Sequence, residues 1–179
     1  MIVKLGLCRM EFIQGDITQQ HVDAIVNAAN SQLAGGSGVD GAIHQIGGPT
    51  IMQETQQKYP EGCAVGKAVA SGAGNLPAKF VFHTVGPIWK GGRQSEPELL
   101  ASACRACLNL ALQHHCESIA FPAISTGAYG YPIDLAANNL VKTTMDFVRW
   151  HQKPQLVRFV LFDAGAFGAF ARAVEEVVP

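Results

Sequence analysis

Residues 23–44, DAIVNAANSQLAGGSGVDGAIH, decide how this chain is expected to fold. A short apolar strand ends in Asn27 and Asn30, a glycine-rich loop follows at 35–38, and a helix opens with Asp40 on its first turn. Glycines in such a loop allow close backbone approach, and a helix start adds a positive dipole end. The stretch therefore indicates an α/β unit that binds an anion such as phosphate, although an ordinary strand–helix connection would also contain glycines.

Composition limits the class of protein. The chain has 179 residues, of which 48% are hydrophobic and 15% charged, so we expect one globular domain over residues 1–179. A net charge of −1 argues against DNA or a membrane surface as the main partner, because both attract basic proteins. Apolar runs are shorter than the roughly 18 residues that span a bilayer, and the N-terminus lacks the pattern of a secretory signal. These features predict a cytoplasmic protein.

The five cysteines are scattered and odd in number, which is typical of reduced thiols. Cys104 and Cys107 form a single CxxC pair, with 114–116 (HHC) nearby. Structural zinc sites usually draw paired ligands from turns, whereas these two cysteines fall on the apolar stripe of a predicted helix. We therefore expect small buried side chains here and no metal site.

Strands and helices alternate along the whole chain. We expect strands at 2–13 (one bulged strand or two), 24–26, 67–70, 80–85, 118–122 and 157–162, and helices at 39–57, 97–113, 133–150 and 168–177. This alternation predicts a three-layer α/β/α domain with a mixed, largely parallel central sheet. Ligands of such sheets bind at the carboxyl ends of the strands, where the loops after Val26, Phe121 and Phe162 are expected to meet.

A second glycine-containing loop, PAISTGAYGYP at 122–132, follows a buried strand and precedes a helix. Ser125, Thr126 and Gly127 offer small side chains and free backbone N–H groups, and Tyr129 would place a ring beside a ligand. A tight turn with a packed tyrosine is the alternative. Two phosphate-type loops at neighbouring strand ends suit a diphosphate better than a single phosphate.

Four further side chains have two interpretations each. Asp16, in GDIT at 15–18, accepts a hydrogen bond from an exocyclic amine such as adenine N6 or caps the following turn. Phe162 stacks on a base or belongs to the core. His44 lies one helical turn after Asp40 and either orients that carboxylate or lines the pocket. His83 falls within a predicted core strand, which favours a hydrogen-bonded core histidine over a catalytic one.

Taken together, five separated segments strongly resemble the macro domain family, in its MacroD-type branch that includes the bacterial O-acetyl-ADP-ribose deacetylases. The segments are GDIT at 15–18, DAIVNAAN at 23–30, GVDGAIH at 38–44, LPAKFVFHTVGPIWKGG at 76–92 and FPAISTGAYGYP at 121–132. They occur in the family's order and span most of the chain. The resemblance implies the three-layer α/β/α fold with a pocket for ADP-ribose.

The resemblance also implies a role for each matching residue. Asn30 would hold the hydroxyls of the distal ribose, and Asp40 would be the carboxylate of the hydrolytic branch. Asn27 is interpreted as shaping the loop and His44 as a supporting residue. The remaining binding residues that carry over are, for the adenine, Asp16, Ile17 and Phe162, and, for the diphosphate and distal ribose, Gly38, Val39, Ser125, Thr126, Gly127, Ala128 and Tyr129.

The implied activity is hydrolysis of an ester on the distal ribose of O-acyl-ADP-ribose, with mono-ADP-ribosylated Asp or Glu side chains of proteins as a second substrate class. Asp40 would activate or orient a water molecule, unless a phosphate of the substrate shares the role of base, and neither a metal nor a cofactor is required. A non-catalytic reader of ADP-ribose and a regulatory partner of an RNA-processing enzyme are the alternatives. Asp40 favours the hydrolase over these alternatives, because many macro domains that only bind ADP-ribose lack an acid at this position.

Two departures from the family pattern affect the expected pocket. The first loop reads GGSG where GGGG is usual, so Ser37 replaces a glycine. Since serine adopts a positive φ at a cost, a stiffer or slightly shifted loop is expected. After Phe162, the segment DAGAFGAF is smaller and less acidic than its counterpart in the family, which bears on the adenine contacts.

Overall fold

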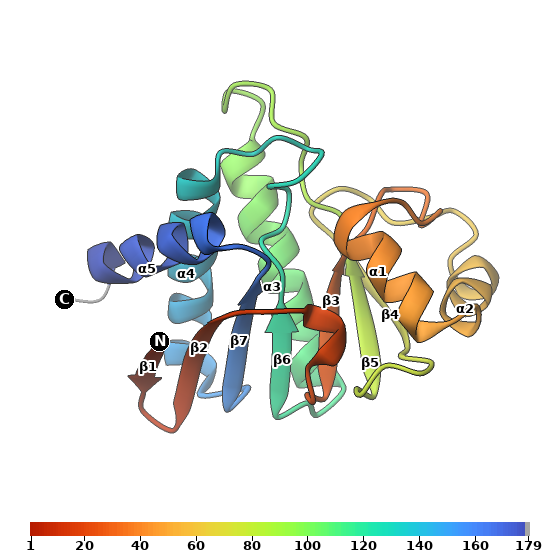
Figure 1. Cartoon of the computed structure of the whole chain (residues 1–179), viewed down its shortest axis with the longest axis horizontal. Coiled ribbons are helices and arrows are strands. Elements are labelled where there is room, and N and C mark those ends of the chain that lie inside the picture. Colours follow the sequence, from red (N-terminus) through yellow and green to blue (C-terminus); the bar gives the residue numbers. More distant parts are fainter. Residues whose placement is uncertain (178–179) are drawn as a thin grey trace.

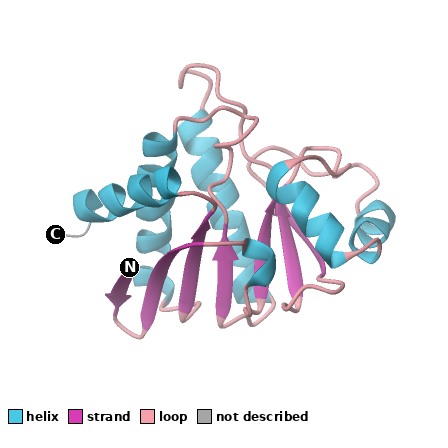
Figure 2. Cartoon of the chain, in the orientation of Figure 1, coloured by secondary structure: helices cyan, strands magenta, loops and turns pink. Residues whose placement is uncertain are grey.

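The computed structural model describes residues 1–177 and leaves the last two residues of the predicted domain undescribed. A central sheet lies between two layers of helices (Figures 1 and 2). The strands are β1 (Ile2–Leu5), β2 (Cys8–Gln14), β3 (Ala24–Ala28), β4 (Ala68–Gly72), β5 (Phe80–Thr84), β6 (Ser118–Phe121) and β7 (Leu156–Leu161). The helices are η1 (Ile17–Gln19), α1 (Gly38–Gly47), α2 (Thr50–Lys58), α3 (Glu96–Gln113), α4 (Ile133–His151) and α5 (Ala164–Val177).

The sheet has seven strands in the order β1-β2-β7-β6-β3-β5-β4. The five inner strands run parallel to their neighbours, and β1 and β4 pair antiparallel at the two edges. Parallel strands need helical connections and are covered on both faces, which explains why residues 24–26 of β3 and 119–121 of β6 are apolar without interruption. The predicted three-layer fold with a mixed, largely parallel sheet is confirmed.

Two apolar clusters hold the layers together. On one face, α3, α4 and α5 cover a core that contains stacked or tilted rings of Phe12, Phe121, Phe159 and Phe170, with centroids 5.1–6.3 Å apart. A smaller cluster around Ile25 lies under α1, α2 and η1 on the other face. Side chains of β3 alternate between the two clusters, so its odd-numbered residues face α1.

Cys104 and Cys107 are small buried side chains, as expected, because both are fully buried on α3 among apolar side chains. Burial raises the pKa of both thiols, to about 11 for Cys104, so they remain protonated and unreactive. Within residues 1–177, no helix combines the length and the apolar character needed to cross a membrane.

Two helix boundaries differ from the prediction. The single helix expected at 39–57 is two helices, because Gly48 adopts a φ of 85° after α1 and Pro49 begins the next turn. The last helix begins at Ala164 and not at Gly168. There, the Asp163 side chain accepts a hydrogen bond from the backbone N of Ala166 at 2.8 Å and thereby caps the first turn.

Candidate functional site

The polar segments singled out in the sequence gather at one edge of the sheet. The inner strands β2, β3, β5, β6 and β7 are parallel, so their carboxyl ends all point to the upper edge in Figure 1. The loops that follow these strands carry Asp16, Asn30, Ser125 and Phe162. An edge of this kind is where ligands of parallel sheets bind.

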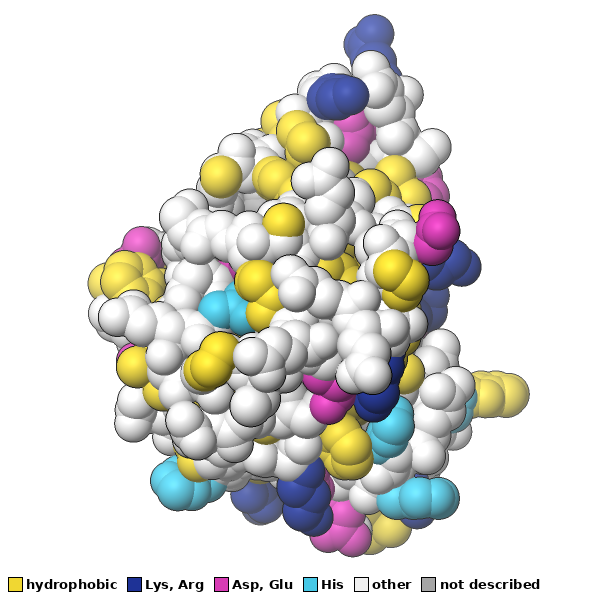
Figure 3. All heavy atoms as spheres, turned by 90° about the vertical axis from the view of Figure 1, so that its right-hand side faces the viewer, with side chains coloured by type: hydrophobic (Ala, Val, Ile, Leu, Met, Phe, Trp, Pro, Cys, Tyr) yellow, Lys and Arg dark blue, Asp and Glu magenta, His cyan; other side chains and the backbone are white. Residues whose placement is uncertain are grey.

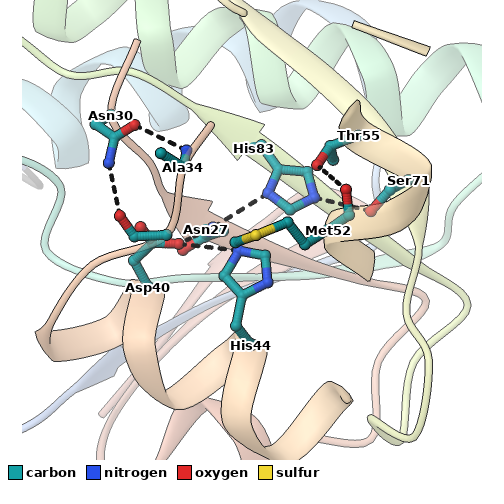
Figure 4. Close-up of polar contacts among 10 residues, drawn as sticks. Asn27, Asn30, Ala34, Asp40, His44, Met52, Thr55, Ser71 and His83 are labelled. Atoms are coloured by element: carbon teal, nitrogen blue, oxygen red, sulfur yellow. Dashed lines mark hydrogen bonds and ion pairs between the residues drawn. The ribbon is translucent and has the colours of Figure 1, made fainter. Parts of the chain in front are cut away.

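Asp40 lies on the first turn of α1 and is 6% exposed. Its Oδ1 accepts a hydrogen bond from Asn27 Nδ2 at 2.8 Å and lies 3.3 Å from His44 Nε2, one helical turn further on (Figure 4). Its Oδ2 faces the glycine loop, since a Cβ added to Gly36 would lie 3.3 Å from this atom. One carboxylate oxygen is therefore held from within the protein, and the other is left toward the loop.

The structure corrects the role expected for Asn27. This residue does not shape the loop, because β3 extends to Ala28 and Asn27 is fully buried inside the strand. As an odd-numbered residue of β3, it faces α1, where its Nδ2 contacts Asp40 Oδ1 and, at 3.1 Å, His83 Nδ1. Asn27 thus connects the sheet to the carboxylate.

Asn30 is the asparagine that shapes the loop. Its Nδ2 donates to the carbonyl oxygen of Gly35 at 2.8 Å, and its Oδ1 accepts from the backbone N of Ala34 at 3.1 Å. An amide side chain has two hydrogens and two lone pairs, so each end of Asn30 retains the capacity for one more hydrogen bond. The predicted contact with ribose hydroxyls is compatible with this arrangement and stays a prediction.

The expected strain at Ser37 is absent. Positive φ angles occur at Gly35 (78°) and Gly38 (60°), whereas Ser37 has a φ of −97° and is extended. The positive φ angles that turn the chain therefore fall on glycines on either side of Ser37. A serine at this position has no cost in backbone conformation. Val39, on the first turn of α1, follows directly, so the helix start lies at the loop as predicted.

The second loop is tightly folded around Ser125. This residue has a φ of 67° and is 6% exposed, and its Oγ has no hydrogen-bond partner within residues 1–177. Gly86, two residues after β5, makes room for it, because a Cβ there would collide with Ser125 Oγ. Thr126 Oγ1 donates to the carbonyl of Ala123 at 2.7 Å, which closes the turn. Gly127 and Ala128 are exposed and Tyr129 is half-buried at the tip.

Asp16 and Phe162 follow neighbouring strands, since Gln14 of β2 pairs with Leu161 of β7. Asp16 caps η1 as expected: its Oδ1 accepts from Thr18 N at 2.8 Å and from Thr18 Oγ1 at 2.7 Å. Ile17 is buried beneath it. Phe162 is 85% exposed, so its interpretation as a core residue is wrong and its ring is free to stack on a ligand.

His83 is a hydrogen-bonded core histidine, as predicted. It lies on β5, is 1% exposed, and contacts Asn27 through Nδ1 and Ser71 Oγ through Nε2 at 2.8 Å. Burial lowers its pKa to about 4, so the ring is neutral. Its link to Asp40 was not predicted, because it depends on the pairing of Asn27 with His83 across β3 and β5.

The face formed by α1 and α2 shows few charged side chains near its centre (Figure 3). A histidine side chain is visible there among backbone atoms, uncharged polar side chains and hydrophobic side chains, and most of the lysines and arginines lie farther out. This face therefore offers few basic side chains to an anion.

A family model described as Macro domain matches residues 26–140. The chain belongs to the macro domain family. This macro domain is 51% identical, over 94% of its length and 95% of the relative, to the O-acetyl-ADP-ribose deacetylase of Salmonella typhimurium. It is 49% identical, over 94% and 97% of the two chains, to a macro domain-containing protein of Caldanaerobacter subterraneus. The resemblance inferred from the five segments is thus confirmed.

Solved macro domains share the fold. The Oceanobacillus iheyensis macrodomain with ADP matches this macro domain with a TM-score of 0.94 and 37% identity, over 99% of this chain and 96% of that one. The Trypanosoma brucei macrodomain in complex with ADP-ribose matches with a TM-score of 0.86 and 35% identity, over 92% and 68% of the two chains.

Proposed function

We propose that this macro domain hydrolyses O-acetyl-ADP-ribose to ADP-ribose and acetate. The observation that carries the proposal is the carboxylate of Asp40, which is held through Oδ1 by Asn27 and leaves Oδ2 toward the glycine loop. Relatives about half identical over nearly the whole chain carry the name O-acetyl-ADP-ribose deacetylase. The same site in a chain with no acid at position 40 would support binding alone.

The adenine end is assigned to Asp16, Ile17 and Phe162. The Oδ1 of Asp16 is occupied by Thr18, and its Oδ2 has no hydrogen-bond partner within residues 1–177. An adenine N6 amine is a donor that this oxygen would accept, while the exposed Phe162 ring would stack on the base. These contacts set one end of the ligand at β2 and β7.

The diphosphate is assigned to the two loops. Backbone N–H groups at Gly38 and Val39 lie at the positive end of α1, which attracts an anion. The turn from Ser125 to Tyr129 supplies a second set of N–H groups and the buried Ser125 hydroxyl, which has no partner within residues 1–177. With the diphosphate between these loops, the distal ribose would reach Asn30 and Asp40.

The reaction is a transfer of the acetyl group to water. A water molecule positioned by Asp40 Oδ2 attacks the carbonyl carbon of the ester, forming one C–O bond and losing a proton. The C–O bond to the ribose oxygen then breaks, and that oxygen takes up a proton, which leaves acetate and ADP-ribose. Asp40 receives the proton of the water or, where a substrate phosphate takes it, orients the water.

The proposal is tested by product analysis after incubation with O-acetyl-ADP-ribose. The wild-type chain is expected to release acetate, and Asp40→Ala is expected to lose about 100-fold or more in kcat, the range that a general base supplies. ADP-ribose binding, measured by calorimetry, is expected to persist in the variant. Binding without turnover in the wild type would favour the reader alternative, and wild-type turnover in Asp40→Ala would remove Asp40 from the mechanism.

The proposal extends to mono-ADP-ribose carried on Asp or Glu side chains. These adducts are also acyl esters of the distal ribose, so attack at the acyl carbon needs the same carboxylate and the same loops. Release of ADP-ribose from a protein modified on acidic residues tests this extension. A chain that deacetylates the small ester but leaves the modified protein intact would restrict the activity to O-acyl-ADP-ribose.

A further inference from the structure

A chain of buried hydrogen bonds leads from Asp40 into the sheet (Figure 4). Asn27 Nδ2 contacts Asp40 Oδ1 at 2.8 Å and His83 Nδ1 at 3.1 Å, and His83 Nε2 contacts Ser71 Oγ at 2.8 Å. Asn27, His83 and Ser71 come from the neighbouring strands β3, β5 and β4 and are at most 2% exposed. Because water does not reach these groups, each one takes its donor or acceptor role from its neighbour.

The roles follow from Asp40. An ionised carboxylate only accepts hydrogen bonds, so Asn27 must present its NH2 group, whose second hydrogen is then directed at His83. His83 Nδ1 is therefore an acceptor, and the single hydrogen of the neutral ring sits on Nε2. Nε2 donates to Ser71 Oγ, and the Ser71 hydroxyl donates onward to the carbonyl oxygen of Gly72 at 2.9 Å.

The opposite tautomer would break the chain at Asn27. A hydrogen on Nδ1 would face the NH2 group of Asn27, so two donors would oppose each other. Rotation of the amide would bring its oxygen to His83, but the same atom would then face Asp40 Oδ1, because one Asn27 atom makes both contacts. The tautomer of His83 and the orientation of the Asn27 amide are thus coupled, and of the two neutral tautomers only the one with hydrogen on Nε2 lets Asn27 donate to both His83 and Asp40 Oδ1.

His83 remains neutral despite its charged surroundings. Asp40 and His44 face it from α1 and Glu54 from α2, and the rings of His44 and His83 are 6.1 Å apart. Burial, followed by the Coulombic effect of His44, lowers the pKa of His83 to about 4, and the two carboxylates only partly offset this effect. Because the His83 ring is neutral, its role toward Asn27 depends on which ring nitrogen carries the hydrogen.

We infer that Ser71 and His83 are positioning residues for Asp40: Ser71 keeps the hydrogen of His83 on Nε2, and His83 in turn keeps the NH2 group of Asn27 on Asp40 Oδ1. Held in this way, the carboxylate directs Oδ2 toward the loop, where the reacting water is proposed to lie. The kinetic part of this inference rests on the proposed deacetylase function, whereas the tautomer does not.

The tautomer is measured on the whole ¹⁵N-labelled chain without substrate, by long-range ¹H–¹⁵N NMR at pH 7. The His83 signals are assigned by their loss in His83→Asn. We expect hydrogen on Nε2 in the wild type and a shift toward Nδ1 in Ser71→Ala. A wild-type His83 with hydrogen on Nδ1, or with both nitrogens protonated, would overturn the inference.

Kinetics separate positioning from stability. Ser71→Ala is expected to lower kcat about 10- to 100-fold, the range for partners that orient a functional side chain, with little change in KM or in the Kd for ADP-ribose. Ser102→Ala is the matched control, because Ser102 also donates to a backbone carbonyl, that of Gly66, at 2.8 Å. Its kcat is expected to match the wild type.

His83 variants give an independent reading if Ser71→Ala fails to fold. His83→Asn offers an oxygen in the place of Nδ1 and is expected to retain more kcat than His83→Leu. Equal losses in these two variants, or wild-type kcat in Ser71→Ala, would contradict positioning through Asn27. A wild-type chain that releases no acetate would contradict the proposed function alone, since the tautomer still tests the hydrogen-bond chain.

Discussion

Asn27 Nδ2 lies 2.8 Å from Asp40 Oδ1, a contact that joins the interior of β3 to the first turn of α1. Asn27→Ala removes this donor and is expected to lower kcat about 10- to 100-fold while ADP-ribose still binds. Asn139→Ala serves as control, because Asn139 donates to the carbonyl of Pro97 at 2.9 Å, between α4 and α3. A steady-state assay that finds both variants equally active would remove Asn27 from the site.

Gly36 lies on the other side of the Asp40 carboxylate, next to Oδ2. A methyl group there would lie 3.3 Å from Asp40 Oδ2, and the φ of Gly36 is not in the left-handed region, so alanine fits the backbone. Gly36→Ala is therefore expected to crowd the free oxygen and to lower kcat more than it lowers stability. Gly168→Ala on α5 adds the same group 3.4 Å from Arg172 and is expected to be neutral. Unchanged acetate release from Gly36→Ala would mean that Oδ2 does not face the water.

Much of the architecture could be predicted from local patterns alone. Alternating apolar strands and amphipathic helices suffice for the layers, because each element must bury one face or stripe. The break at Gly48 and Pro49 was missed because the apolar spacing continues through it, although a glycine followed by proline is itself a stop signal. The start of α5, which Asp163 caps, also has a local signal in the sequence, but a single aspartate is a weak one.

The two asparagines show which features of the site could not be predicted from the sequence alone. Asn27 and Asn30 are three residues apart and look alike, yet one is a buried strand residue and the other closes a loop. The distinction depends on where β3 ends and on its pairing with β5, which aligns Asn27 with His83. Strand order and register arise from tertiary packing, so Ser71 could not be connected to Asp40 in advance. A cytoplasmic location and an RNA-processing partner stay predictions.

Phe162 offers a direct test of the adenine end. Its ring is 85% exposed, so removing it is expected to leave stability unchanged. Stacking of a base on an aromatic ring contributes about 1–3 kcal/mol, so Phe162→Ala is expected to weaken ADP-ribose binding by about 5- to 150-fold. Trp150, which is 84% exposed on α4, provides the matched control. Calorimetry that gives Phe162→Ala and Trp150→Ala the same Kd as the wild type would place the base elsewhere.

Asp16 combines a structural and a binding role that one pair of variants separates. Asp16→Asn keeps an oxygen to cap Thr18 but replaces the other oxygen with an NH2 group, which opposes adenine N6. We expect near wild-type stability with weaker ADP-ribose binding. Asp16→Ala is expected to lose the cap as well, at a cost of about 1 kcal/mol in the free energy of unfolding. Equal ADP-ribose affinity in Asp16→Asn and the wild type would leave Asp16 as a cap alone.

The depressed pKa of His83 predicts how stability depends on pH. The pKa is about 4 in the folded chain and 6.5 in the unfolded one, so between these values the unfolded state binds more protons. The contribution of neutral His83 to the free energy of unfolding is complete above pH 6.5 and is lost as pH falls toward 4. The pKa difference corresponds to about 3 kcal/mol. Urea unfolding of the wild type and His83→Asn at pH 7 and pH 4.5 isolates this residue, because the other histidines are common to both. The wild type should lose more stability than the variant on acidification, and parallel losses would show that His83 is not buried in its neutral form.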